Sequence, residues 1–296
     1  MGCEVIAQQC KSPQELIALV ADADYVITQF APMISSVIDA MEKCKVIVRY
    51  GIGVDNVDLD ATAARGIPVC NVPDYCINEV ADHTLGLILA LNRQLVRVCN
   101  HVRDGLWKLP VPFEQIRVLT EMVVGVVGYG RIGRAVAERL KPFRCKILVS
   151  DPAVEASAVR ASGCIPVTFD ELLKTSDLIT LHCPSTDQTR YMINEDSLQR
   201  VKKGVLLVNA SRGNLIKIDA LIAALRGGQV SAVALDVTDP EPINTDSPLL
   251  KMENVIITNH IASVSVSARE KLRTGVANTV VCAIRGEKLP NVVNNV

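Results

Sequence analysis

Arg212, Glu241 and His260 are three residues whose side chains could together bind an acid substrate and move a proton. Each follows a strand-like apolar run or lies in the loop after one. A guanidinium can grip a carboxylate and its neighbouring carbonyl oxygen through paired N–H donors, and an imidazole can give or take a hydroxyl proton. A carboxylate beside that imidazole favours its protonated form, which suits an acid in the reduction of a 2-keto acid. We therefore predict that Arg212 orients the substrate, that His260 is the acid and base, and that Glu241 holds His260.

Each of these residues also has an alternative interpretation. Arg212, within Asn-Ala-Ser-Arg-Gly, could be a surface residue after a strand, and Glu241, between two prolines, could fill a turn. His182 also ends a strand-like run and is therefore a rival of His260 as proton donor. The tripeptide 182–184 is favoured instead as one wall of a cofactor crevice.

Residues 123–133 predict a dinucleotide site. They form an apolar run that ends in Gly128-Tyr129-Gly130-Arg131-Ile132-Gly133, followed by a helix-like run to residue 140. In such a pattern the first glycine allows a tight turn, the second lets the backbone approach a pyrophosphate, and the third lets the helix pack closely on the strand. Asp151 ends the next strand-like run, 18 residues after Gly133, where a carboxylate can bind a ribose 2′-hydroxyl. An ordinary glycine-rich turn explains the glycines but not the position of Asp151.

Strand-like and helix-like runs alternate along most of the chain, which predicts parallel sheets. The first part begins with a strand at 4–8 and continues through helices at 13–20 and 35–43. Residues 78–102 have apolar side chains at a helical period and predict one long, well-buried connecting helix. After Asp151 the alternation resumes and predicts a doubly wound sheet.

Ligands bind outside the carboxyl ends of the strands in such a sheet, so the residues after each strand are the first candidates for function. Asp236 ends one strand and is expected to accept a hydrogen bond from a nicotinamide carboxamide, with a structural cap on its loop as the alternative. His83 and His101 lie within and near the end of the helix predicted at 78–102, where structural roles are favoured. Trp107 follows that helix and either packs within the subunit or, as we favour, contacts another subunit.

The composition indicates the class of protein and its partners. The chain has 296 residues, 49% of them hydrophobic, which is enough for about two domains with apolar cores. Its 31 basic and 32 acidic residues are mixed along the sequence, so we expect a small molecule or another subunit as partner, and neither nucleic acid nor a membrane. The ten cysteines show no CxxC pairs, and the amino terminus lacks a signal-peptide pattern. We expect reduced thiols, a cytoplasmic location and no metal site.

The chain resembles the D-isomer-specific 2-hydroxyacid dehydrogenases over nearly its whole length. The segment NVPDYCINEVADH is similar to a bacterial branch near the C-terminal-binding-protein corepressors, whose members are often phosphoglycerate dehydrogenase-like. The segments that carry the family resemblance are, in order, RYGIGVDNVDLDATAARGIPVCNVP, VVGVVGYGRIGRAVAERL, LITLHCPSTDQTRYMIN, LLVNASRGNLI, ALDVTDPEP and NHIAS.

This resemblance implies an NAD-dependent enzyme that transfers a hydride between nicotinamide and a small D-2-hydroxy acid or 2-keto acid, with D-3-phosphoglycerate as one candidate. It implies that Arg212, Glu241 and His260 occupy the catalytic positions. It also implies that Ile52 and Gly53 offer backbone N–H groups to the substrate carboxylate. Taken together, the glycine pattern and the resemblance predict cofactor contacts at Gly128, Gly130, Arg131, Ile132, Gly133, Asp151, His182, Cys183, Pro184, Ala210 and Asp236.

The resemblance also implies an architecture. We expect an α/β protein in which a doubly wound parallel-sheet (Rossmann) domain, residues 77–262, is inserted in a smaller flavodoxin-like substrate domain made of residues 1–76 and 263–296. Family members usually begin with one more strand and helix before the counterpart of residues 4–8, so we expect the substrate domain to lack one edge. A homodimer is implied as well.

Two functions fit these residues. The first is an NAD-dependent dehydrogenase of small 2-hydroxy acids. The second is an NAD-sensing, corepressor-like binding protein, in which the cofactor favours a dimer that recruits peptides. The set Arg212, Glu241 and His260 favours the enzyme, although the corepressors resemble this chain at those positions too.

Overall fold

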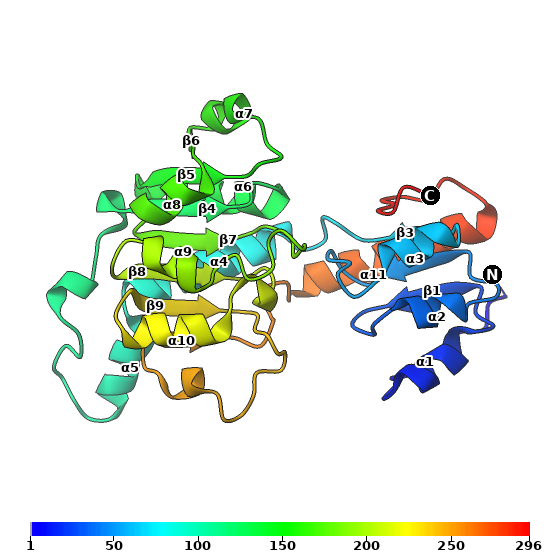
Figure 1. Ribbon diagram of the computed structural model, residues 1–296, viewed down its shortest axis with the longest axis horizontal. Helices are drawn as coiled ribbons and strands as arrows, with labels where there is room; N and C mark the ends of the chain where they lie inside the picture. Colours follow the sequence, from blue (N-terminus) through cyan, green and yellow to red (C-terminus); the bar gives the residue numbers. More distant parts are fainter. Residues whose placement is uncertain (1) are drawn as a thin grey trace. The chain divides into compact units, whose positions relative to one another are not determined.

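The computed structural model describes residues 2–296, which form two compact units (Figure 1). Unit 1 comprises Met1–Tyr75 and Ser265–Val296, and unit 2 comprises Cys76–Val264. Each unit contains one sheet in which all pairings between strands are parallel, which confirms the predicted α/β class. Among residues 2–296, no helix is both long enough and apolar enough to cross a membrane.

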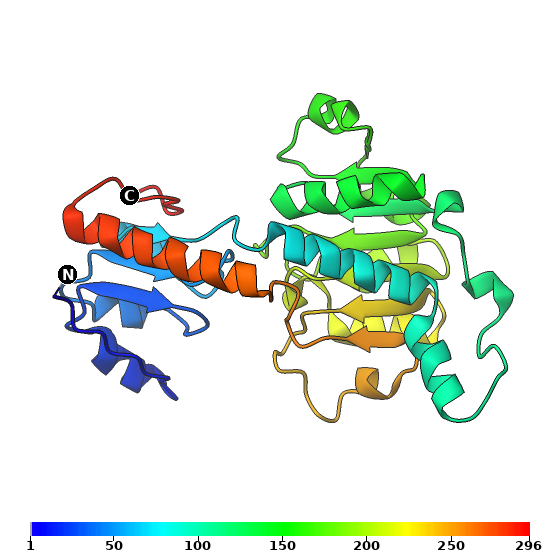
Figure 2. The same cartoon turned by 180° about the vertical axis from the view of Figure 1, so that it is seen from behind.

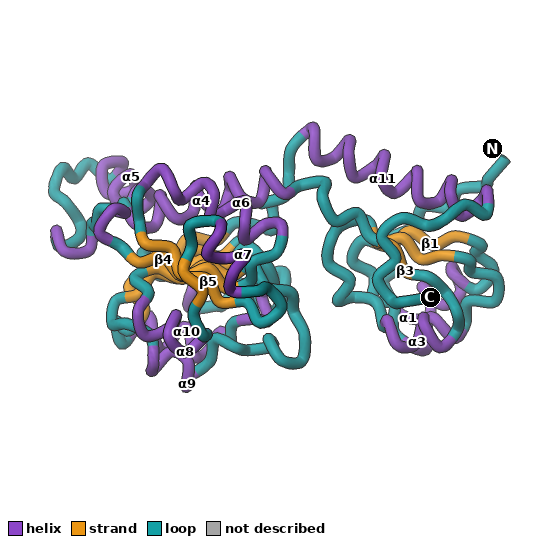
Figure 3. The backbone as a smooth tube through the Cα atoms, turned by 90° about the horizontal axis from the view of Figure 1, so that it is seen from above, coloured by secondary structure: helices purple, strands orange, loops and turns teal. Residues whose placement is uncertain are grey.

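Unit 1 has a three-stranded sheet in the order β1-β2-β3. Helix α11 packs on one face of this sheet, and the shorter helices α1 and α3 lie on the other (Figures 2 and 3). Buried apolar residues on both faces, such as Ile47 on one and Val48 on the other, explain why the strands are mostly apolar. The elements are α1 (Pro13–Val20), β1 (Tyr25–Thr28), α2 (Ser35–Asp39), β2 (Val46–Arg49), α3 (Leu59–Ala64), β3 (Val69–Cys70) and α11 (Val266–Arg285).

Unit 2 has a seven-stranded sheet in the order β10-β9-β8-β7-β4-β5-β6. Helices α4 and α6 cover one face, and α8, α9 and α10 cover the other (Figure 3). The elements are α4 (Ile77–Asn92), α5 (Leu95–Arg103), β4 (Val123–Val127), α6 (Arg131–Leu140), β5 (Lys146–Ser150), α7 (Ala156–Ala161), β6 (Ile165–Pro166), α8 (Phe169–Thr175), β7 (Leu178–Leu181), α9 (Glu195–Arg200), β8 (Val205–Asn209), α10 (Ile218–Arg226), β9 (Val230–Leu235) and β10 (Val255–Ile257).

The order of the strands in unit 2 reverses between β4 and β7. From β4 the chain proceeds through β5 to β6 on one side, and from β7 it proceeds through β8 and β9 to β10 on the other. The loops that follow β4 and β7 therefore diverge from a common point at the carboxyl edge of the sheet, which is where ligands bind in doubly wound sheets. The sheet thus places the glycine pattern after β4 next to residues 182–184 after β7.

The strand predicted at residues 4–8 is wrong. These residues have no regular secondary structure and are exposed, and Val5 and Ile6 bury little of their side chains. An apolar run forms a strand only where a neighbouring strand accepts its backbone hydrogen bonds, and β1 is paired with β2 alone. Helix α2, predicted to reach residue 43, ends at Asp39, and the Glu42 N–H donates to the Ala21 carbonyl instead of continuing the helix.

The single helix predicted at 78–102 is also wrong. The chain forms α4 and α5 instead, separated at Gln94, which has a left-handed backbone with φ of 55°. Asn92 is buried at the end of α4, where its side-chain amide donates to the Arg117 carbonyl, so this end is held by a distant loop. Helix α4 has the expected buried face, whereas α5 has no buried residue.

Candidate dinucleotide and catalytic site

The glycines after β4 are required by their surroundings. Gly128 has φ of 88°, and a methyl group on it would lie 2.5 Å from the backbone nitrogen of Cys183. A methyl group on Gly133 would lie 2.1 Å from the Gly128 carbonyl oxygen. Gly130 differs, because a methyl group there would meet no protein atom within 4 Å. The turn therefore needs Gly128 and Gly133 for its own packing, while the space beside Gly130 at the start of α6 suits a pyrophosphate.

The two residues after Gly130 begin helix α6. Arg131 is its first residue and is exposed, and Ile132 is partly buried against the core of the sheet. No acidic residue lies in the first turn of α6, so its amino-terminal N–H groups face no competing carboxylate of their own helix. This end of the helix fits the negative charge of the phosphates.

Asp151 follows β5 and is bound to the glycine turn. Its Oδ2 accepts the Tyr129 N–H at 2.6 Å, and its Oδ1 accepts the Ala153 N–H at 2.8 Å. The carboxylate is partly exposed and keeps further lone pairs for a ligand. It therefore lies beside the turn, where a ribose carried by the predicted pyrophosphate would be found.

Residues 182–184 line the same edge from the end of β7. Burial lowers the pKa of His182 to about 4, so its ring is neutral near pH 7. Its Nε2 lies 2.9 Å from Thr180 Oγ1, and its buried Nδ1 has no hydrogen-bond partner among the described residues. Burial raises the pKa of the Cys183 thiol to about 11, and Pro184 is exposed. A neutral ring carries no extra proton to give near pH 7. His182 is therefore better explained as part of the wall of the cofactor crevice than as the proton donor.

The loop after β8 is shaped by Asn209. This fully buried side chain donates to the Arg212 carbonyl at 2.8 Å and accepts the Ser211 N–H at 3.0 Å. The Ser211 hydroxyl donates to the Cys183 carbonyl at 2.6 Å, which joins this loop to the one after β7. Ala210 is partly buried within the turn, and Arg212 Nη1 donates to the Ser211 carbonyl at 2.8 Å. Together these bonds fix the direction of the chain at Arg212.

The loop after β9 contacts the loop that carries Arg212. A methyl group on Gly213 would lie 2.0 Å from the Thr238 carbonyl oxygen, so the two backbones touch. Glu241 lies three residues further on and is hydrogen bonded to His260, with 2.5 Å between Oε1 and Nδ1. Both of these side chains are partly exposed to solvent. The structure therefore brings Glu241 and His260 together and places Arg212 on an adjoining loop of the same sheet edge.

Asp236, at the end of β9, is a loop cap. Its side chain is fully buried, Oδ1 accepts from the Thr258 hydroxyl at 2.5 Å and the Ile261 N–H at 3.0 Å, and Oδ2 accepts the Ala262 N–H at 2.9 Å. This arrangement corresponds to the structural alternative given for this residue. Its contact with nicotinamide stays a prediction.

Ile52 and Gly53 belong to unit 1, in the loop after β2. The Asn71 side chain donates to the Ile52 carbonyl at 2.7 Å, and the Val72 N–H donates to the Gly51 carbonyl at 3.0 Å. Asn71 was not among the predicted site residues, although an asparagine directly after a buried strand is a signal for such a loop contact. The role of Ile52 and Gly53 in binding substrate remains a prediction.

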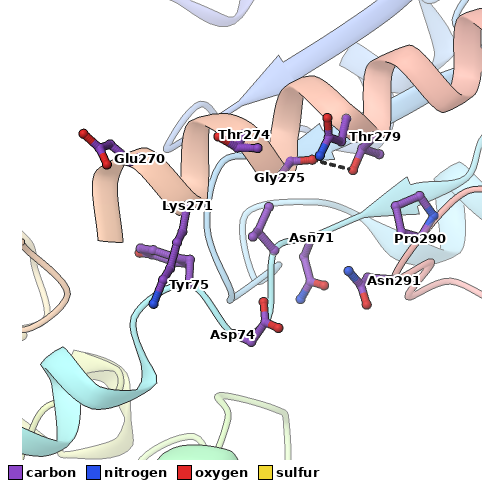
Figure 4. A pocket seen from close by; sticks show the side chains of 12 residues that line it. Asn71, Asp74, Tyr75, Glu270, Lys271, Thr274, Gly275, Thr279, Pro290 and Asn291 are labelled. Carbon is purple, nitrogen blue, oxygen red and sulfur yellow. Dashed lines mark hydrogen bonds between the residues drawn. The ribbon is translucent and has the colours of Figure 1, made fainter. Parts of the chain in front are cut away.

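Asn71 also lines a pocket of about 620 Å³ within unit 1, between the 71–75 segment, one side of α11 and residues 290–291 (Figure 4). Three charged side chains, Asp74, Glu270 and Lys271, contribute to its walls. Gly275 brings α11 close to the segment, since a methyl group there would lie 2.8 Å from a Val72 methyl carbon. None of the predicted site residues lines this pocket.

Comparison with known proteins decides the family. A family model described as the NAD binding domain of D-isomer specific 2-hydroxyacid dehydrogenases matches residues 85–262, more than half of the chain. The chain belongs to this family. The 2-hydroxyacid dehydrogenase resemblance carried by the sequence motifs is thus confirmed, and residues 85–262 are an NAD-binding domain.

Several relatives of this chain carry more specific names. It is 38% identical over 281 residues to D-3-phosphoglycerate dehydrogenase of Mycobacterium leprae, covering 95% of this chain and 53% of the relative. It is 36% identical over 295 residues to glyoxylate reductase of Korarchaeum cryptofilum, covering 98% of this chain and 86% of the relative. The chain therefore spans about half the length of the phosphoglycerate dehydrogenases that it matches.

A solved structure extends the likeness to the fold. The crystal structure of D-lactate dehydrogenase from Aquifex aeolicus, complexed with NAD and lactic acid, has a TM-score of 0.84 and 32% identity, over 92% of this chain and 86% of that one. TT0316 protein from Thermus thermophilus has a TM-score of 0.87 and 34% identity, over 98% of this chain and 92% of that one. The doubly wound architecture is shared with these proteins.

Proposed function

We propose that this chain is an NAD-dependent oxidoreductase that interconverts a small D-2-hydroxy acid and the corresponding 2-keto acid. The observation that carries the proposal is the Glu241–His260 hydrogen bond, at 2.5 Å, on the sheet edge that also holds the glycine turn and Asp151. An acid–base pair beside a dinucleotide site is what hydride transfer coupled to proton transfer requires.

The residues of the chain would divide the work as follows. The amino-terminal N–H groups of α6 bind the pyrophosphate and Asp151 binds the ribose hydroxyls. The nicotinamide is surrounded by residues 182–184, Ala210 and Asp236. The nicotinamide supplies or accepts the hydride at the substrate's C2. His260 donates a proton to the carbonyl oxygen during reduction and takes it back during oxidation, while Glu241 orients the imidazole through its hydrogen bond to Nδ1.

Substrate binding needs donors for a carboxylate. We propose that Arg212 provides paired N–H groups for the carboxylate and the adjacent carbonyl oxygen, and that the backbone N–H groups of Ile52 and Gly53 bind the carboxylate as well. The Asn71–Ile52 and Val72–Gly51 hydrogen bonds support this role, because they hold that loop in one conformation. Glyoxylate, pyruvate and the 2-keto acid derived from D-3-phosphoglycerate are the substrates to test first, given the names of the relatives.

The test follows NADH absorbance with this panel of 2-keto acids for the wild type, His260→Ala and Arg212→Gln. His101→Ala, on α5, is the matched control. We expect turnover of at least one keto acid by the wild type and the control. The His260 and Arg212 variants should lose at least about 100-fold in kcat/KM while still binding NADH. Absence of turnover across the panel, together with NAD-dependent dimerisation, would favour the corepressor-like binding protein instead.

We further propose a homodimer formed through unit 2. Trp107 is 90% exposed and Phe113 is 81% exposed, so packing within the subunit is wrong as the explanation of Trp107. Side chains of this kind, on a helix without buried residues and the loop after it, suit burial against a second copy. Other large apolar side chains exposed in this region are Leu95, Val96, Val102, Leu106, Leu109 and Val118.

Sedimentation of the wild type and of a Trp107→Ser, Phe113→Ser double variant tests the dimer. We expect the wild type to sediment as a dimer and the double variant as a monomer, and a monomeric wild type would contradict the proposal.

We propose a cytoplasmic location because all ten cysteines lie in the described chain and are free thiols.

A further inference from the structure

We propose that His83 is a positioning residue for the loop that carries His260. It acts through Thr258 and Asp236, and none of these three residues needs to touch the substrate for this role. The inference rests on the proposed function of His260 as proton donor.

The first step is the contact of His83 with the end of the sheet. His83 lies on α4, and its Nε2 is 3.2 Å from Thr258 Oγ1 and 3.5 Å from Asp236 Oδ1. The Thr258 hydroxyl donates its proton to Asp236 Oδ1 at 2.5 Å. That hydroxyl therefore offers only lone pairs to His83, so Nε2 is the ring nitrogen that carries hydrogen. The result is a directed chain of donors from His83 through Thr258 to Asp236.

The second step is the hold of Asp236 on the catalytic loop. Its backbone carbonyl accepts the His260 N–H at 2.8 Å, and its carboxylate accepts the Ile261 N–H at 3.0 Å and the Ala262 N–H at 2.9 Å. Three consecutive backbone N–H groups, those of residues 260–262, thus donate to Asp236. The position of the His260 imidazole relative to Glu241 depends on this anchoring.

The third step is the backbone of His260 itself. It has a left-handed conformation, with φ of 57°, which is unfavourable for a residue with a side chain. A loop with this conformation relaxes unless other bonds hold it. The Asp236 carboxylate supplies those bonds, and its own side chain is fully buried. Across the described residues, His83 is the one side chain from outside segment 236–262 that makes a polar contact with this carboxylate.

These steps assign His83 a role that its burial alone does not explain. A buried carboxylate that already accepts three hydrogen bonds holds its orientation best when it is fixed from a second element. His83 provides that connection from α4, which packs on β8 and β9 within the same unit. Loss of the Nε2–H donor would remove the connection of Thr258 and Asp236 to α4 and weaken their hold on the His260 loop.

The test compares two substitutions of His83. His83→Gln keeps an N–H donor at about the reach of Nε2, and His83→Leu fills similar space without a donor. With the best keto-acid substrate we expect His83→Leu to lower kcat about tenfold, the Kd of NADH to stay within about twofold, and His83→Gln to recover most of kcat. A purely structural role would not distinguish the two variants at equal thermal stability. His83→Asn, one carbon too short to reach Thr258, replaces the leucine variant if that one fails to fold.

A second readout is independent of turnover. The chain has four histidines, so ¹⁵N-histidine labelling with single substitutions assigns the ring signals of His260. We expect the His260 Nδ1 signal, which reports its hydrogen bond to Glu241, to move in His83→Leu and to keep the wild-type position in His83→Gln. Unchanged His260 signals and kcat in His83→Leu, or equal losses in both variants, overturn the inference. If no keto acid is turned over by the wild type, the proposed function fails, while the ring signals still decide the role of His83.

Discussion

Glu241 Oε1 lies 2.5 Å from His260 Nδ1, although the two residues are 19 positions apart and follow different strands. We propose that the other ring nitrogen, Nε2, is the one that meets the substrate oxygen. Since the Nδ1 partner of a histidine sets its tautomer and orientation, we propose that Glu241 controls which proton His260 offers.

Glu241→Gln removes the charge of this pair and keeps an acceptor oxygen. We expect kcat for keto-acid reduction to fall about 10- to 100-fold, because the protonated imidazole loses its counter-charge, while the Kd of NADH is little changed. Glu241→Ala should fall further, since it also loses the hydrogen bond. Steady-state kinetics with NADH titration measures both quantities. Wild-type kcat in Glu241→Ala would remove this residue from the mechanism.

Gly128 and Gly130 make a matched pair, since both are glycines of one turn and only the first is packed against the protein. Gly130 has φ of −72°, which alanine adopts without strain. We expect Gly130→Ala to keep the wild-type melting temperature and to weaken NADH binding at least about tenfold, because its methyl group would occupy the pyrophosphate space.

Gly128→Ala should instead destabilise the protein by at least about 2 kcal/mol, because φ is 88° and the added methyl would lie 2.5 Å from the Cys183 nitrogen. Thermal unfolding and NADH fluorescence titration separate the two effects. Normal NADH affinity in Gly130→Ala would show that the pyrophosphate lies elsewhere.

Asp151 sets the preference between the two nicotinamide cofactors in our proposal. Its charge binds the ribose hydroxyls and repels a 2′-phosphate, so the wild type should bind NADH more tightly than NADPH. Asp151→Ser should lower the preference for NADH over NADPH, measured as the ratio of the two binding affinities, by about tenfold or more. Asp151→Asn serves as a control that keeps an acceptor for the Tyr129 or Ala153 N–H. A wild type that prefers NADPH would refute this role.

The lowered pKa of His182 predicts how the free energy of unfolding depends on pH. Burial lowers its pKa to about 4 in the folded protein, against about 6.5 when unfolded. The unfolded chain therefore takes up the proton first as pH falls. The stabilising contribution is complete above about pH 6.5 and is lost progressively towards about pH 4, by up to about 3 kcal/mol.

His182→Gln cannot titrate in this range and keeps an N–H for the Thr180 hydroxyl. Urea unfolding at several pH values should show that the wild type loses more stability on acidification than the variant does. Parallel losses in the two proteins would mean that His182 is accessible to protons in the folded state.

The sequence alone was sufficient for the features that depend on local pattern. The alternation of apolar strands with amphipathic helices predicted the doubly wound sheet, and the glycine spacing before α6 predicted the turn that Gly128 and Gly133 form. These features follow from backbone geometry and from burial within one or two elements. The same local reasoning failed at residues 4–8 and at Gln94, because a strand needs a partner and a helix can end where a distant carbonyl captures Asn92.

Only the tertiary structure decided which partners meet. That Asn209 shapes the Arg212 loop and that His83 reaches Thr258 and Asp236 depends on how strands and helices far apart in the chain pack together. The burial that lowers the pKa of His182 arises in the same way. Hydrogen bonds and desolvation act over a few ångströms in space, and a linear pattern carries no such distances between remote residues.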